Sequence, residues 1–191
     1  MPYKFVHADV CGPISPLAYG EYRYYLLFTC EATKCRHVEF MIRKNEVLEN
    51  VKALCHRIET QCGYKIQTFR LDNGTEFGGG KLEEYCKEEG ITLQYSAPYT
   101  PEQNGLAEVS NRILHTLARA MVVDGKLPGY LWPEAVRASV YLLNRSLNSS
   151  TGFTTSPIEE YDSRLTGQPP QPVSLANARV YGYNAYIHTP A

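Results

Sequence analysis

The hydrophobic pattern of this chain changes its period near residue 45, and this change limits the folds that the chain can adopt. Before it, the runs 4–10, 22–30 and 35–41 are rich in β-branched and aromatic residues, which is typical of strands. From 45 to 62 apolar side chains recur at helical spacing, and Gly63 follows as a stop signal. The first 62 residues therefore predict three neighbouring strands and one amphipathic helix.

The next part of the chain alternates between short strands and a helix. The runs 66–71 and 91–95 have the apolar alternation of strands, and residues 81–89 between them have a helical pattern that Gly90 closes. Three strands followed by helix, strand, helix and strand is an α/β order. We therefore expect a mixed five-stranded sheet flanked by helices.

A long helix is expected from Gly105 to Val123, because its apolar and polar positions separate at about 100° per residue. Pro101 fits the first position of a helix, but the Asn-Gly pair at 104–105 is typical of a turn. We therefore place the helix start near Gly105 and treat residues 99–104 as a loop. The apolar positions predict a core-facing side, and the polar positions predict a solvent-facing side. The expected core side consists of Leu106, Val109, Ile113, Leu117, Ala120 and Met121, and the expected solvent side of Glu108, Arg112, His115 and Arg119.

A second helix is expected from Trp132 to Leu147, and after it the composition changes. The spacing puts Trp132, Val136, Val140, Leu143 and Leu147 on its core side, with Pro133 near its start. From residue 148 onward Ser, Thr, Gly and Pro dominate, which predicts a linker or a surface extension with a possible hairpin at 179–188. The expected organisation is a core domain at 1–147 and an irregular extension at 148–191.

Composition excludes several classes of protein. The chain has no run of about 18 apolar residues and no signal-peptide pattern at its start, so we expect a soluble, intracellular protein with no membrane partner. Its six cysteines form no C-x-x-C pair, which favours free thiols and no structural zinc. The net charge of −1 argues against a simple nucleic-acid-binding module, unless carboxylates gather at a site where cations bind.

Three acidic residues have contexts that favour such a site: Asp9 in the first strand, Asp72 at the end of the fourth and Glu108 on the long helix. An aspartate inside an apolar strand is costly unless something compensates its charge, and Mg²⁺ prefers carboxylate oxygens. Two such ions can activate the attacking oxygen and stabilise the leaving oxygen of a phosphodiester. Taken singly, each residue has an ordinary explanation: a strand-end hydrogen bond, a turn and a solvated helix face.

The joint pattern resembles the integrase core of copia-type (Pseudoviridae) retrotransposons, within the retroviral integrase superfamily and its RNase H-like fold. The resemblance is carried by residues 7–13 (HADVCGP), 71–77 (LDNGTEF) and 97–108 (APYTPEQNGLAE). Between Asp72 and Glu108 lie 35 residues, the spacing of the D,D-35-E signature. Further matches follow at residues 132–135, 141–145, 155–157 and 179–182, so the resemblance covers essentially the whole chain.

The resemblance implies a metal-dependent strand transferase that joins the 3′-OH ends of retrotransposon DNA to a target phosphodiester. Asp9, Asp72 and Glu108 would be the catalytic residues and would ligate Mg²⁺, for which Mn²⁺ can substitute. The partners would be double-stranded DNA, as element ends and as target, and further copies of the chain. The family often has basic residues directly after the glutamate, but this chain has Val109 and Ser110. Phosphate contact would therefore fall to Asn104 and Gly105 in the preceding loop and to Arg112, His115 and Arg119, with His7 and Asn73 supporting the metal ligands.

Two other hypotheses remain open at this point. The chain could be a catalytically silent or host-adopted module that binds DNA or dimerises, or a nuclease of RNA–DNA hybrids. His7 could equally be a packed strand histidine. The integrase hypothesis implies action in the nucleus after a cytoplasmic phase. The family's amino-terminal His/Cys zinc module and long carboxy-terminal region are not part of these 191 residues.

Overall fold

A five-stranded mixed sheet forms the centre of the molecule. The computed structural model describes residues 1–71, 80–95, 101–149, 152–176 and 178–183, with only the backbone of 101–104. The strand order is β3-β2-β1-β4-β5. Strands β1 to β3 pair antiparallel as a meander, and β4 and β5 add parallel to β1. The strands are β1 (Phe5–Cys11), β2 (Tyr24–Cys30), β3 (Arg36–Met41), β4 (Thr68–Leu71) and β5 (Thr92–Tyr95).

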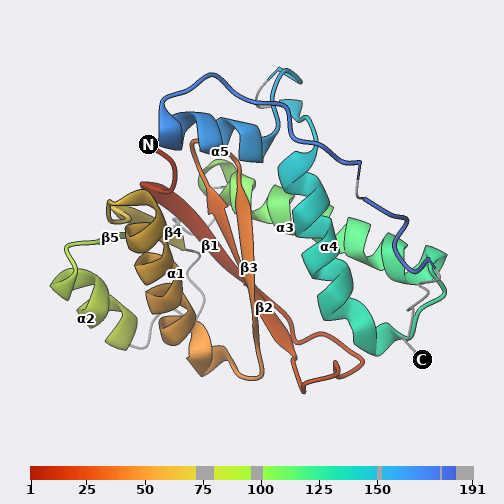
Figure 1. Cartoon of the computed structure of the whole chain (residues 1–191). Helices are drawn as coiled ribbons and strands as arrows, with labels where there is room; N and C mark the ends of the chain where they lie inside the picture. The colour runs from red at the N-terminus through yellow and green to blue at the C-terminus, as the bar shows by residue number, and fades with distance from the viewer. Residues whose placement is uncertain (72–79, 96–100, 150–151, 177, 184–191) are drawn as a thin grey trace, which may run out of the picture.

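Helices cover both faces of this sheet, which confirms the expected α/β architecture of a mixed five-stranded sheet flanked by helices. Figure 1 shows α1 and α3 on opposite faces, with α4 beside α3 and α5 across one end of the sheet. Gly63 ends α1 in the left-handed conformation, as its sequence position predicts. The helices are α1 (Val47–Cys62), α2 (Lys81–Glu88), α3 (Pro101–Asp124), α4 (Trp132–Arg145) and α5 (Pro157–Thr166), with short 3₁₀ turns at Lys44–Glu46 and Gly129–Leu131.

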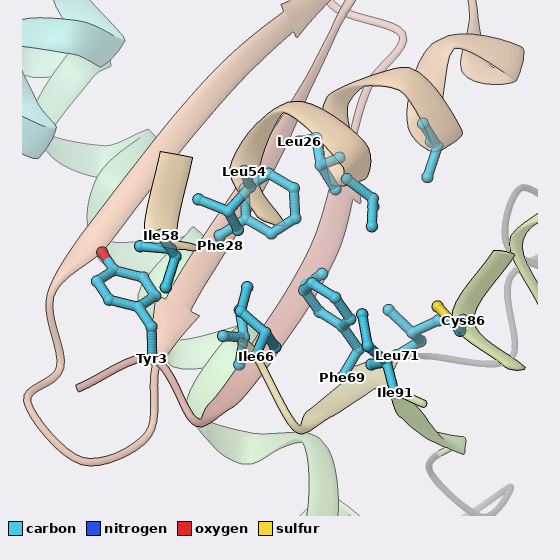
Figure 2. Packing of buried hydrophobic residues seen from close by; sticks show 14 of the residues in the cluster. Tyr3, Leu26, Phe28, Leu54, Ile58, Ile66, Phe69, Leu71, Cys86 and Ile91 are labelled. Carbon is cyan, nitrogen blue, oxygen red and sulfur yellow. The ribbon is translucent and has the colours of Figure 1, made fainter. Parts of the chain in front are cut away.

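The larger core lies between the sheet and α1. Leu26 and Phe28 from β2 meet Leu54 and Ile58 from α1, and all four are at most 3% exposed. Figure 2 shows the neighbouring side chains of β4 and the residues that follow α2 continuing this layer. These residues come from alternate strand positions and from one stripe of α1, which is the pattern expected of a half-buried strand and an amphipathic helix.

A second core lies on the other face, under α3 and α4. Tyr25 and Leu27 from β2 pack with Leu114 of α3 and with Trp132 and Val136 of α4. Strand β2 therefore has apolar residues on both faces, and six of its seven residues are buried. This explains why the sequence of β2 is a nearly continuous apolar run, whereas that of β1 alternates.

The start of α3 differs from the prediction. The helix begins at Pro101, four residues before Gly105, so the backbone of 101–104 is helical rather than a loop. Proline is favoured at the first helical position because its missing N–H needs no partner there. The proline signal was therefore the correct one, and the Asn-Gly pair lies inside the helix.

The core side predicted for α3 is also wrong in part. The buried stripe consists of Ala107, Ser110, Leu114 and Ala118, whereas Val109 and Ile113 are each 41% exposed. The periodicity favoured the large apolar residues, but three of the four buried positions carry a small side chain. Small residues let a helix approach a sheet closely, and this benefit is invisible in a count of hydrophobic side chains.

The segment after residue 148 contains a helix that the composition did not predict. Helix α5 starts with a capping box, in which Ser156 accepts from the Glu159 N–H while the Glu159 carboxylate accepts from the Ser156 N–H. Pro157 occupies its first position.

Two other predictions for this end of the chain were wrong. Helix α4 ends at Arg145, and Leu147, expected in the core, is 53% exposed. Residues 179–183 form no strand, and the rest of the predicted hairpin lies outside the described residues.

Asn144 of α4 completes the hydrogen bonding of the edge strand β3. Its Oδ1 accepts from the Arg36 N–H and its Nδ2 donates to the Arg36 carbonyl, both at 2.8 Å. The side chain is 9% exposed and occupies the place of a neighbouring strand. The α4 layer is therefore bound to the sheet by polar as well as apolar contacts.

We expect Asn144→Leu to lower the free energy of unfolding by about 2 kcal/mol, because it leaves the Arg36 N–H and C=O without partners in a partly buried place. Urea denaturation of the purified chain measures this change. Ser146→Ala, which removes an exposed hydroxyl from the same end of α4, is the matched control and should change stability by less than about 0.5 kcal/mol. A loss in Asn144→Leu no larger than in this control would contradict the assignment.

Acidification should weaken the contact between β3 and α1. A hydrogen bond from His37 lowers the pKa of Glu39, and Arg57 of α1 adds to the effect through its ion pair at 3.0 Å. A lowered folded-state pKa gives stability that is present above the unfolded value of 4.5 and is lost as the pH falls through the folded value. We expect the wild type to lose up to roughly 1 kcal/mol more than Glu39→Gln between pH 6 and pH 3. Glu49→Gln, at an exposed pair with Lys52, should behave like the wild type, and an equal loss in all three would refute the role of Glu39.

Candidate active site

Asp9 lies on the face of β1 that α3 covers. Along β1, Val6, Ala8 and Val10 pack into the core under α1, so the alternate residues His7, Asp9 and Cys11 face the other way. Asp9 is half-buried and sits opposite Leu27 in the pairing with β2. The carboxylate therefore projects toward α3 near the carboxyl end of the strand.

Asn111 of α3 contacts this carboxylate directly. Its Nδ2 donates to the Asp9 Oδ2 at 2.5 Å, across 102 positions of sequence. Glu108 lies three residues earlier on the same helix and is exposed. Residues three apart on a helix are neighbours, with Cβ atoms about 5 to 6 Å apart, so Glu108 lies one turn of α3 before the residue that contacts Asp9.

Asp72 and Asn73 lie outside the described residues. Strand β4 is described up to Leu71, which pairs with Ala8 of β1 in the parallel register. Asp72 directly follows Leu71 in the chain, and Asp9 directly follows Ala8. The sequence prediction for Asp72 therefore concerns the residue after the last described position of β4, and the described residues do not test it.

The donor set suits a hard divalent cation. Asp9 and Glu108 offer carboxylate oxygens, which are the ligands that a hard divalent cation prefers. Among the described residues, no group of three or more His, Cys, Asp or Glu side chains could hold a metal ion. Asp72 is not one of the described residues. Two of the three predicted ligands, Asp9 and Glu108, thus belong to elements that pack against each other, and the third lies outside the described residues.

A row of basic residues follows Glu108 along the outer face of α3. Arg112, His115 and Arg119 are all exposed, as the sequence predicted. Gly105, one of the two residues predicted to contact DNA before Glu108, is half-buried, and a Cβ added to it would meet nothing within 4 Å. The side chain of Asn104, the other one, lies outside the described residues.

His7 is packed into the sheet and bonded to a different acid. It is 3% exposed, and its Nε2 lies 3.0 Å from the Glu31 Oε2 in the turn between β2 and β3. Burial lowers the pKa of His7, although the hydrogen bond with Glu31 acts in the opposite direction. This geometry favours the packed strand histidine over a residue that supports the metal ligands.

The sequence reasoning missed Asn111. One signal could have found it, because Asn111 lies one helical turn after Glu108 and beside the basic row. The predicted polar side of the helix did not include Asn111. Only the crossing of α3 over β1 shows that its amide reaches Asp9.

The fold belongs to a recognisable structural class. The catalytic core domain of BIV integrase has a TM-score of 0.62 and 19% identity, covering 86% of this chain and 98% of that chain. The HTLV-2 integrase catalytic core domain, solved in complex with magnesium in a trimeric form, has a TM-score of 0.58 and 20% identity, covering 83% and 95%. The fold is therefore that of an integrase catalytic core, within the RNase H-like class.

Sequence relatives narrow this class. The Pol polyprotein of transposon TNT 1-94 from Nicotiana tabacum is 32% identical over 97% of this chain, and that of transposon RE1 from Arabidopsis thaliana is 33% identical over 75%. The Ty1-DR6 Gag-Pol polyprotein of Saccharomyces cerevisiae is 28% identical over 75%. The chain belongs to the copia-type integrase cores.

The chain spans only a small part of these relatives. It covers 13% of the tobacco polyprotein and 10% of the RE1 polyprotein. No protein-family model matches the chain. In the described part of the chain, no helix is long and apolar enough to cross a membrane.

Proposed function

We propose that this chain carries the chemistry of DNA integration, joining the 3′-OH ends of retrotransposon DNA to a target phosphodiester. The observation that carries the proposal is the Asn111–Asp9 hydrogen bond, which joins the helix that carries Glu108 to the strand that carries Asp9. The third acid, Asp72, follows the strand paired with β1. The relationship to copia-type Pol polyproteins supports the same activity.

Asp9, Asp72 and Glu108 would hold Mg²⁺ or Mn²⁺. Bound there, divalent ions would activate the attacking hydroxyl and stabilise the charge on the leaving oxygen. The magnesium in the HTLV-2 core supports this assignment. The D,D-35-E spacing between Asp72 and Glu108 has the same implication, because it is the spacing of the metal-binding acids in the family that the chain resembles.

Asn111 would act as a positioning residue for Asp9. Its amide donates to one carboxylate oxygen, which fixes the rotation of the side chain and therefore the direction of the Asp9 lone pairs. Arg112, His115 and Arg119 would contact phosphates of the DNA end, since they are exposed and continue from Glu108 along the same helix. The nuclear site of action and assembly with further copies remain predictions, the latter supported by the trimeric form of the HTLV-2 core.

Each acid should be required for joining. With labelled duplex ends, a plasmid target and Mg²⁺ or Mn²⁺, we expect Asp9→Asn, Asp72→Asn and Glu108→Gln to lower strand transfer by about two orders of magnitude or more, because each removes a charge that would bind the metal. Glu84→Gln, at an exposed position on α2, is the matched control and should retain activity.

Metal titration separates this function from a silent module. Asp72→Asn should abolish the saturable Mg²⁺ or Mn²⁺ binding of the wild type. Unchanged binding would favour the silent module, and cleavage of RNA–DNA hybrids without any joined product would favour the nuclease. Circular dichroism of each variant shows whether the fold is retained.

Asn111→Leu should weaken Mg²⁺ binding by about 10- to 100-fold, because Asp9 would lose the hydrogen bond that orients it. High Mn²⁺ should then restore much of the joining rate, which a misfolded variant could not do. Thr116→Val, on an exposed position of the same helix, is the control and should leave metal affinity unchanged. A wild-type metal affinity in Asn111→Leu would show that the bond does not position Asp9.

A further inference from the structure

The eleven arginines of the chain divide into two groups by their side-chain contacts. Arg57 and Arg164 form ion pairs, Arg137 and Arg145 lie over aromatic rings, and Arg70 does so while also donating to Gln94. Two more donate to backbone carbonyls, namely Arg36 and Arg179. Within the described parts of the chain, where every arginine lies, the remaining four guanidinium groups have no side-chain partner: Arg23, Arg43, Arg112 and Arg119.

These four arginines gather at two places. Arg112 and Arg119 belong to the exposed row on α3. Arg23 and Arg43 line one hollow of about 550 Å³ at the end of the sheet where β2 begins and β3 ends. Both arginines are exposed and have no ion pair to break, so their two guanidinium groups are available to an anionic ligand in this hollow.

The residues that line this hollow carry a net positive charge. It consists of Leu17, Glu21, Arg23, Tyr24, Ile42, Arg43 and Lys44, so three cations face one carboxylate. Glu46, which is close in sequence, uses its carboxylate to accept from the N–H groups of Ile42 and Arg43. The Lys44 ammonium lies 5.9 Å from the centre of the Tyr24 ring.

The hollow lies at the same end of the sheet as Asp9. Asp9 pairs with Leu27, and Arg23 precedes Leu27 by four residues on the antiparallel neighbour. At about 3.4 Å per residue and about 4.8 Å between strands, Arg23 is roughly 15 Å from Asp9 and Arg43 roughly 20 Å. Duplex DNA rises about 3.4 Å per base pair, so this offset corresponds to roughly four to six base pairs.

We propose that Arg23 and Arg43 bind the phosphate backbone of the target duplex, four to six base pairs from the phosphodiester that is attacked. The proposal rests on the proposed function. An element end stops at its reacting 3′-OH, so its phosphates lie on one side of the acids only. The target continues on both sides, and it therefore needs a second contact surface away from α3.

The contact predicts a specific salt dependence. Each phosphate contact contributes about 0.9 to the slope of log affinity against log salt. Arg23→Gln with Arg43→Gln should therefore lower the slope by about 1.8, so that its deficit in DNA binding shrinks about tenfold between 50 and 200 mM salt. The probe is a covalently closed DNA circle without metal, which offers target-like duplex and no ends.

The double variant Lys87→Gln with Arg164→Gln removes the same charge from α2 and α5 and should keep the wild-type slope. A wild-type slope in Arg23→Gln with Arg43→Gln would overturn the proposal. A reduced slope on short linear duplexes but not on the circle would overturn the assignment to target DNA. In strand transfer, the Arg23 and Arg43 variant should raise the KM for target about tenfold with kcat retained.

Failure of the proposed function gives a different result. A wild type that joins no DNA but whose slope falls in Arg23→Gln with Arg43→Gln would refute integration and leave the contact established. A wild type that joins DNA but shows no slope change would refute only the contact.

Discussion

The close packing of α3 against β1 is the constraint on which the candidate site depends. Ala107 and Ser110, the buried residues on either side of Glu108, are small, which lets α3 pack closely on the sheet while Asn111 bonds to Asp9. A larger side chain at either position would move the helix outward by its own thickness. We therefore expect these small residues to influence how near Glu108, on the helix, lies to Asp9, on the sheet.

The parts of the fold that could be predicted are those whose signal is local. The alternation in β1 to β5 and the helical stripe of α1 are properties of neighbouring residues, and Gly63 marks the helix end by its conformation. The core face of α3 could not be predicted in the same way, because its burial depends on which residues are small, and not on which are apolar. Helix α5 was missed because its capping box at Ser156 lies within a segment whose overall composition is that of a linker.

The candidate site also has a part that the sequence predicts and a part that depends on how the elements pack. The types and spacing of Asp9, Asp72 and Glu108 are written in the sequence and predicted three acids at one site. Asn111 could not be predicted, because its role depends on the angle at which α3 crosses β1. A motif contains the residues that the chemistry requires. Asn111, which joins α3 to β1, is not one of them, because it supports the site through the packing of the fold.

The near-neutral charge of the chain does not argue against a DNA partner once the pairing of its cations is considered. The net charge of −1 counts Arg57 and Arg164 equally with Arg23 and Arg112, although the first two already face carboxylates. Only unpaired cations can neutralise phosphates without first breaking an ion pair, and the unpaired arginines lie on α3 and at the end of the sheet. A long-range electrostatic field from the whole chain would be weak, but within about a Debye length of 8 to 10 Å these unpaired arginines would attract a phosphate locally. Local pairing, and not total charge, therefore decides where this molecule can hold a nucleic acid.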